Sequence, residues 1–366
     1  MKKSLYILAA AAIVAGCASN DLRNDVVKDA PIGFTKVYVE NVTKAVYTNA
    51  NFETAGNTFG VFGFKTTSKQ NNARVFDNTK VTFQGGLNTA DGYNATSDWA
   101  YSPLVYWDKT ATEYNFFAYA PSDADYDWTA ALTSNNPNTF SITGFKQATS
   151  QSTMIDLMTD LSTRNGSTNH VTGAAIGKND VTFTFGHILS NINFKMAVSP
   201  ALKSDETNNP VTVVSFELGK IKMNGSYAYV TDAYKWTLAT GDDQNAADFS
   251  ATLTSNGNVF DSKALKASNS EYTNVPGMTD LLFVPQSVDA TYKVTIRYKI
   301  NNEIYDKEIL LSEFKSGTGD DATSLTSWVA GYQYIYQIVI GPNPILFDVE
   351  TVSAWADGGT YTYTIQ

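Results

Sequence analysis

The stretch DVTFTFGHILSNINFKMAV, residues 180–198, alternates apolar and polar side chains with the period of two that is typical of β-strands. Turn-forming residues such as NNPN, 135–138, separate it from further stretches of the same kind. These are residues 80–85, 113–121, 211–225, 291–300, 332–341 and 360–366. No stretch predicts a helix longer than a few turns. Many short strands joined by turns predict an all-β protein built from antiparallel β-sandwiches.

The length of the chain favours two domains. The sequence has 366 residues, which is too many for a single hydrophobic core and comfortable for two. The stretch SPALKSDETNNP, residues 199–210, is charged, contains a proline near each end and has no periodicity, so it is the best candidate for a linker. We therefore predict an N-terminal domain over residues 31–198 and a C-terminal domain over residues 199–366.

Charge and motif content argue against several classes of function. The formal net charge of −10 disfavours nucleic acid as a partner. The two histidines, His170 and His187, belong to no metal-ligand motif, and His187 lies within an apolar strand, where a structural role is favoured. The sequence has no H-E-x-x-H, C-x-x-C or G-x-S-x-G motif. We expect no enzymatic activity, no metal and no cofactor.

The single cysteine, Cys17, follows a segment typical of bacterial lipoprotein signals. Lys2 and Lys3 precede the apolar run LYILAAAAIVA, which is too short to span a bilayer, and small residues come directly before the cysteine. The sequence predicts a signal peptide over residues 1–16, lipidation of Cys17 and a tether over residues 17–30. The alternative is an ordinary secretory signal with an incidental cysteine.

The two ends of the mature chain carry unusual strands. IGFTKVYVENVTKAVYT, residues 32–48, predicts one strand that contains a candidate site for a trypsin-like protease between Lys44 and Ala45; a lysine there is otherwise a solvated edge residue. Residues 344–366 predict a terminal hairpin with a glycine turn, which either packs on its own domain or adds to the sheet of a neighbour. Its apolar residues of shared parity are Ile345, Phe347, Val349, Trp355, Tyr361, Tyr363 and Ile365.

An aromatic cluster in SDWAYSPLVYW, residues 97–107, allows two interpretations. Trp99, Tyr101 and Trp107 can form a platform for sugar rings, or they can fill the core of a sheet. The alternation of the surrounding strands favours the core, and the sequence leaves the glycan platform open.

Taken together, these motifs resemble the fimbrillin-like family, the type V pilins of the Bacteroidales. The resemblance extends over most of the mature chain. It is carried by the lipobox at Cys17, by IGF and TKA within residues 32–45, and by FGVFGF (59–64), WAYSPLVYWDKTATEYNFFAYAPS (99–122), DLMTD (156–160), VTFTFGHILSNINFKM (181–196), LLFVPQ (281–286), WVAGYQYIYQIVI (328–340) and the tail from Trp355 to Gly359.

The resemblance implies a fold and a mode of assembly. It implies two transthyretin-like antiparallel β-sandwich domains in tandem, exported to the outer membrane on a lipid anchor. A trypsin-like protease then removes the first strand, and C-terminal strands of another subunit fill the vacated groove, building a surface fimbria that supports adhesion. The family often has arginine at the cleavage site; here Lys44 stands there, with Arg23 and Lys36 as other candidate sites.

Other roles share parts of this pattern. An anchor or tip subunit of the same system has the same fold, and its partners are likewise other pilins. A surface glycan-binding lipoprotein that uses Trp99, Tyr101 and Trp107 is the alternative from a different class of protein.

Overall fold

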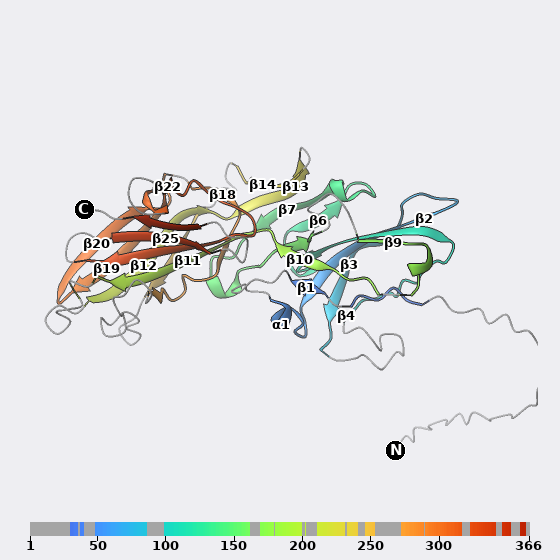
Figure 1. The fold of residues 1–366 in the computed structure, drawn as a ribbon, viewed down its shortest axis with the longest axis horizontal. Coiled ribbons are helices and arrows are strands. Elements are labelled where there is room, and N and C mark those ends of the chain that lie inside the picture. Colours follow the sequence, from blue (N-terminus) through green and yellow to red (C-terminus); the bar gives the residue numbers. More distant parts are fainter. Residues whose placement is uncertain are drawn as a thin grey trace, which may run out of the picture.

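The structure is a computed structural model, and it describes the greater part of the chain. The described residues are 30–35, 37–39, 48–85, 99–161, 169–178, 180–199, 202, 211–230, 233–240, 246–252, 272–288, 290–316, 323–341, 346–352 and 359–363. Over these residues the molecule is elongated, with a lobe at each end of its long axis (Figure 1). The all-β prediction is confirmed: strands dominate, and the α-helix of the described residues, α1 (Asn49–Phe52), has one turn.

The N-terminal lobe contains an eight-stranded sheet and a four-stranded sheet. The order of the larger sheet is β1 (Tyr38–Val39), β10 (Thr184–His187), β8 (Met158–Asp160), β5 (Ala111–Ala120), β2 (Thr58–Thr67), β3 (Ala73–Phe83) and β4 (Trp99–Ala100), with β9 (Asn169–Thr172) also paired to β5. The order of the smaller sheet is β14 (Ala233–Leu238), β13 (Asn224–Val230), β7 (Phe140–Lys146) and β6 (Thr129–Leu132).

The C-terminal lobe is a sandwich of two further sheets. One has the order β16 (Thr273–Asn274), β11 (Ser190–Val198), β24 (Gln333–Ile340), β25 (Leu346–Val352) and β26 (Gly359–Tyr363), with β17 (Leu281–Phe283) also paired to β11. The other has the order β15 (Ala246–Thr252), β12 (Val211–Lys222), β19 (Lys293–Ile300) and β20 (Glu303–Leu310). Two short pairs, β18 (Gln286–Ser287) with β23 (Ser327–Trp328) and β21 (Lys315–Ser316) with β22 (Thr323–Ser324), complete it.

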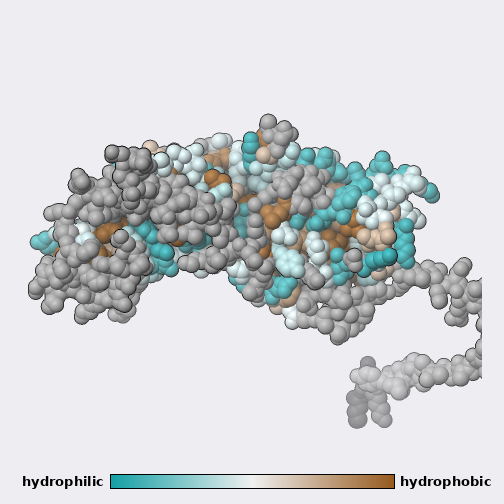
Figure 2. All heavy atoms as spheres, in the orientation of Figure 1, coloured by the Kyte–Doolittle hydropathy of each residue, from teal (hydrophilic) through white to brown (hydrophobic). Residues whose placement is uncertain are grey.

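The period of two explains how these sheets bury their cores. In β11, Ile192, Phe194 and Met196 alternate with polar residues and enter one core together with side chains from β12, β19 and β24. Phe194 of β11 meets Phe216 of β12 with ring centroids 5.1 Å apart, which places the two sheets face to face. Figure 2 shows that hydrophobic side chains reach this side of the described surface only in separate small patches.

A third core joins the two lobes. It combines side chains of β2 and β5 with side chains of the four-stranded sheet, and it includes Leu282 and Val284 from the C-terminal half. Phe117 of β5 and Phe140 of β7 lie 4.4 Å apart between ring centroids within it. Apolar contacts therefore continue from one lobe into the other.

Strand pairing does not follow the predicted boundary at residues 198 and 199. The stretch 180–198 reads as one run, but β10 pairs in the N-terminal lobe and β11 pairs in the C-terminal lobe. The core residues are odd-numbered in β10, such as Phe185, and even-numbered in β11, so the alternation shifts at Ile188 and Leu189. The hairpin of β13 and β14 then returns to pair with β7. The chain crosses between lobes more than once, and a division at one point fails for this reason.

Candidate functional site

The N-terminal segment, residues 30–39, lies between residues 105–107 and residues 181–185. On one side it runs antiparallel to residues 105–107: the Ile32 amide donates to the Val105 carbonyl oxygen at 2.8 Å, and the Trp107 amide donates to the Ala30 carbonyl oxygen at 3.0 Å. These bonds make residues 105–107 one wall of the space that the segment fills.

The opposite wall is formed by residues 181–185, which run parallel to the segment. The Val181 amide donates to the Gly33 oxygen at 2.8 Å, and the Tyr38 amide donates to the Phe183 oxygen at 2.9 Å. Strand β1 then continues the pairing along β10. We call the space between the two walls the slot. Residues 30–32 bond to one wall and residues 33–39 bond to the other, and β1 is the edge strand of the eight-stranded sheet.

The side chains that the segment places in the slot are deeply buried. Ile32, Phe34, Val37 and Val39 each expose 2% of their surface or less. The step from Phe34 to Val37 breaks the period of two, so the structure has bridges at Pro31 and Phe34 followed by the short β1, where the sequence predicts one continuous strand. Residues 40–47, which complete that predicted strand, lie outside the described residues.

Phe34 is the centre of this packing. Its ring centroid lies 5.5–6.5 Å from those of five aromatic residues, of which one belongs to a wall of the slot and the others precede the second wall or lie in the sheet: Phe183, Tyr101, Phe59, Phe76 and Phe116. Phe59 of β2, Phe76 of β3 and Phe116 of β5 come from three adjacent strands of one sheet. The segment therefore covers the core on this face of the sheet.

The predicted glycan platform is part of this core, which corrects that interpretation. Trp99, Tyr101 and Trp107 expose only 2%, 9% and 2% of their surfaces. The Tyr101 hydroxyl donates to the Ile32 carbonyl oxygen at 2.7 Å, and burial raises the pKa of Tyr101, which keeps the hydroxyl protonated as a donor. Tyr101 and Trp107 bond to the N-terminal segment, and Trp99 packs against Phe52 and Phe59, so no face remains for a sugar ring.

Asp108 fastens the wall formed by residues 105–107. Its carboxylate accepts a hydrogen bond from the Lys65 ammonium group at 2.8 Å and caps the Thr110 amide at 2.9 Å. The Asp108 amide in turn donates to the Tyr114 hydroxyl at 2.7 Å. The bond from Lys65, followed by the bonds from Thr110, lowers the pKa of Asp108 to about 2.

Replacing Asp108 by asparagine should destabilise the chain in a pH-dependent manner. Because the folded-state pKa is lowered, the carboxylate stabilises the fold above pH ~4, and this contribution is lost as the pH falls towards 2. Urea unfolding of wild type and Asp108→Asn should differ at pH 7 and agree at pH 2. Asp127→Asn, at an exposed position in the same lobe, is the control and should change the free energy of unfolding by less than ~0.5 kcal/mol. A difference for Asp108→Asn that stayed constant with pH would contradict the assignment.

The C-terminal strands lie in the other lobe. β25 pairs antiparallel with β24, with Phe347 opposite Ile338, and β26 pairs with β25, with Tyr363 opposite Phe347. Phe347 and Val349 therefore belong to β25, and Tyr361 and Tyr363 to β26. Figure 1 places β25 in the lobe opposite the one that holds β1 and β10. The remaining predicted site residues, Cys17, Lys44, Ala45, Ile345, Trp355 and Ile365, lie outside the described residues.

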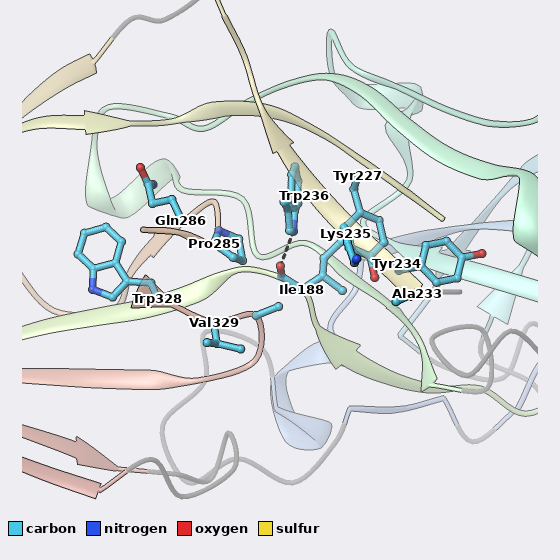
Figure 3. Close-up of a pocket in the computed structure, with 11 residues that line it drawn as sticks. Ile188, Tyr227, Ala233, Tyr234, Lys235, Trp236, Pro285, Gln286, Trp328 and Val329 are labelled. Carbon is cyan, nitrogen blue, oxygen red and sulfur yellow. Dashed lines mark hydrogen bonds between the residues drawn. The ribbon is translucent and has the colours of Figure 1, made fainter. Parts of the chain in front are cut away.

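A second concavity lies at the junction of the lobes (Figure 3). It has a volume of about 550 Å³ and runs between Tyr234 and Trp236 of β14 on one side and Trp328 and Val329 on the other. The Trp236 indole N–H donates to the Ile188 carbonyl oxygen at 2.6 Å, where the chain crosses between lobes. This concavity therefore lies where the β13–β14 hairpin is hydrogen-bonded to Ile188, the residue at which the chain passes from one lobe to the other.

The described part of the chain contains no cluster of metal-binding side chains and no helix that could span a membrane. No group of three or more His, Cys, Asp and Glu side chains comes together among these residues. None of the helices in the same residues has the length and the hydropathy needed to cross a bilayer.

Sequence reasoning did not find the two walls of the slot or the central place of Phe34. The signal was present in IGF, where Ile32 and Phe34 flank a glycine, but nothing local to residues 105–107 or 181–185 indicates that they face a common strand. That proximity arises only in the folded chain.

Comparison with known proteins first places the fold. A solved structure of a fimbrial protein from Bacteroides vulgatus covers 89% of this chain and 99% of its own, with a TM-score of 0.54 at 21% identity, so the fold is that of a fimbrial protein. The chain belongs to the fimbrillin-like family, whose model matches residues 43–355. It is also 26% identical to the fimbrium subunit Fim1C of Phocaeicola vulgatus, over 97% of each chain.

The predicted resemblance to fimbrillins is therefore confirmed. The family is one of structural fimbrial proteins rather than enzymes, which agrees with the expectation of no catalytic site. Membership implies assembly with other fimbrial subunits at the cell surface.

Proposed function

We propose that this chain is a structural subunit of a cell-surface fimbria that polymerises by donor-strand exchange. The observation that carries the proposal is the N-terminal segment, which is bonded to both walls of the slot and ends a few residues before the candidate cleavage site at Lys44 and Ala45. Cleavage there releases residues up to Lys44, and the segment leaves with them. Under this proposal we expect the two lobes to correspond to two transthyretin-like β-sandwich domains.

Loss of the segment creates an acceptor site. Each fully buried aliphatic or phenylalanine side chain contributes about 1.5–3 kcal/mol to stability, so an empty slot carries a large cost in exposed apolar surface. The amides and carbonyls of residues 105–107 and 181–185 also lose their partners, and unpaired strand edges are templates for another strand. A strand from a second subunit relieves both costs by β-strand addition.

The positions of the termini favour a filament over a closed pair. The slot lies in one lobe of an elongated molecule and β25 lies in the other lobe (Figure 1). A donor from one lobe and an acceptor in the other form a head-to-tail contact between different surfaces. Contacts of this type build open filaments when the rotation between subunits does not close a ring.

The route to the surface follows from the N-terminal sequence. The signal over residues 1–16 directs export, and Cys17 takes the lipid that anchors the precursor in the outer membrane. A trypsin-like protease cuts after Lys44, which frees the subunit from its lipid. The mature subunit then joins other pilins, of its own kind and accessory ones, in a fimbria that supports adhesion.

Replacement of Lys44 by glutamine tests this pathway. Mass spectrometry of wild-type surface protein should find chains that begin at Ala45, and electron microscopy should find filaments. Lys44→Gln should leave acylated chains that begin at Cys17 and form no filaments, because the slot stays filled. Lys36→Gln and Arg23→Gln are matched controls at the other basic sites and should behave like wild type. Filaments made of intact, acylated chains would refute the proposal.

The same measurements separate the alternative roles. An anchor subunit retains its lipid and its N-terminal segment within an assembled fimbria, whereas a stalk subunit does not. The glycan-binding alternative depends on Trp99, Tyr101 and Trp107, and these side chains are buried in the core rather than available to a sugar.

A further inference from the structure

A small cavity lies in the C-terminal lobe, on the face of the paired strands β11 and β24 that points away from the core. Even-numbered side chains of these strands, such as Phe194 and Tyr336, enter the core, so the odd-numbered side chains point to the other face. The cavity has a volume of about 240 Å³. We call it the polar cavity, and its lining includes Asn193, Lys195, Asn274, Asp280, Gln333 and Ile335.

The turn between β16 and β17 forms one wall of the polar cavity and is bonded to β11. The Phe194 amide donates to the Met278 carbonyl oxygen at 2.9 Å. The Asp280 amide donates to the side-chain oxygen of Asn193 at 2.8 Å, and the side-chain amide of Asn191 donates to the Asp280 carboxylate at 3.2 Å. These bonds hold the wall in place before anything binds, as in most small-molecule sites.

Gln333 places a buried amide in the polar cavity. The residue is 4% exposed, and it pairs with Asn191 across the two strands. Within the described ranges of the chain, its side-chain amide has no hydrogen-bond partner. Buried amides are nearly always hydrogen-bonded, so this amide takes its partner from whatever fills the cavity.

The groups around the polar cavity match a neutral ligand that both donates and accepts hydrogen bonds. The Gln333 amide does both, the Asp280 carboxylate accepts, and the Lys195 ammonium group donates. One side chain of each sign leaves these lining residues without net formal charge. Ile335, which is 3% exposed, adds an apolar surface. A ring with neighbouring hydroxyl groups and an apolar face has this combination of properties, and sugars are such rings.

We propose that the polar cavity binds one neutral monosaccharide unit of a glycan. Ring hydroxyls bond to Gln333 and Asp280, and the apolar face of the ring rests on Ile335. The cavity is smaller than the roughly 300–1,000 Å³ of pockets for drug-sized ligands, so it holds a single ring. Asn274 is exposed, which places one side of the lining at the solvent. The net charge of −10 disfavours acidic sugars.

This inference goes beyond the proposed function, because it needs neither cleavage nor polymerisation. The residues named above belong to β11, β16, β24 and the turn after β16, and none of them belongs to the slot or its walls. The site is also distinct from the buried aromatic cluster of residues 97–107. In a fimbria the cavity is repeated in every subunit, so weak binding at one site becomes avid on a surface that carries many glycans.

Saturation-transfer NMR on the protein purified from the cell surface tests the class of ligand. The probes are the methyl pyranosides of glucose, galactose, mannose, fucose and N-acetylglucosamine, with N-acetylneuraminic acid and glycine for comparison. At least one neutral sugar should bind, and the two charged probes should not. Binding of glycine would show a site for zwitterions, and binding of N-acetylneuraminic acid alone would show a site for anions. Either result, or no binding of any neutral sugar, would overturn the proposal.

Two variants separate a role in binding from a role in the fold. Gln333→Leu and Asp280→Asn each remove or invert one hydrogen-bonding group at nearly constant size, and each should weaken binding of the sugar about tenfold or more in NMR titrations. Since the Gln333 amide has no partner in the described chain, Gln333→Leu should not lower the midpoint of urea unfolding. A lower midpoint with unchanged sugar binding would show a structural role and overturn the proposal.

Gln337→Leu is the matched control. Gln337 lies four residues further along β24 on the same face and is 7% exposed, but it is not among the residues that line the polar cavity. Its replacement should leave sugar binding unchanged, and an equal loss in Gln337→Leu and Gln333→Leu would place the sugar elsewhere. Filaments from a protein that binds no sugar would overturn this inference alone, whereas sugar binding by a protein that forms no filaments would overturn only the proposed function.

Discussion

A subunit that lacks residues 344–366 should form no filaments after trimming, and it should also shorten the filaments of wild-type subunits. The deletion removes β25 and β26, which are the proposed donor, and leaves the slot in the other lobe unchanged. Such a subunit accepts a strand and cannot donate one. Added to wild-type subunits in increasing proportion, it should cap growing ends and reduce the mean length measured by electron microscopy.

A point variant is the control in case the deletion unfolds the C-terminal lobe. Phe347→Asp keeps the whole chain and places a charge where the donor must enter an apolar pocket, which carries a large desolvation cost. It should abolish filaments as the deletion does, while Glu350→Ala, of opposite parity in the same strand, should permit them. Normal filaments from both the deletion and Phe347→Asp would rule out this tail as the donor.

Replacing Phe34 by alanine should strongly destabilise the untrimmed subunit and leave the filament unaffected. Phe34 is fully buried among five aromatic rings, and deleting such a side chain costs about 3–5 kcal/mol. The loss should appear in the urea unfolding of the precursor. Because residue 34 leaves with the cleaved segment, filaments assembled from Phe34→Ala precursor should have wild-type stability.

The neighbouring Tyr38 provides the control for Phe34. It lies on the same segment but is 46% exposed, so Tyr38→Ala should cost the precursor less than ~1 kcal/mol. Filaments weakened by Phe34→Ala would mean that the segment stays in the assembled subunit, which would contradict its replacement by a donor.

Rigidity of the subunit follows from features that the sequence does not display. The third core and the bond from Trp236 to Ile188 join the lobes along the long axis of the molecule. A fimbria transmits force from subunit to subunit, and a continuous apolar core between lobes resists bending better than a polar linker does.

The alternation in the sequence was sufficient to predict the strands, since a period of two is a local property of a half-buried sheet. Phe183 and Phe185, or Ile192 and Phe194, can be assigned to a buried face from their spacing alone. Spacing does not tell to which core each face belongs. The alternation shifts at Ile188 and Leu189, so β10 and β11 belong to different cores, and a single boundary after residue 198 does not describe the pairing.

The aromatic cluster in residues 97–107 also shows that local sequence does not reveal which side chains are buried together. The composition of residues 97–107 fits a sugar platform and a core equally well, because both need large aromatic side chains. Only burial separates the two, and burial depends on residues 30–39 and 181–185, which lie far away in the sequence.

The sequence by itself determined that the chain is all-β, that it belongs with the fimbrillins, and that unusual strands stand at both ends. These properties are local, since they depend on residue type and spacing within a few residues. The tertiary structure alone decided that the N-terminal segment is bonded to both walls of the slot, that Phe34 is its anchor, and that the two ends of the chain occupy opposite lobes. Those properties depend on pairing and packing between segments that lie far apart in the sequence, and they cannot be read from any one segment.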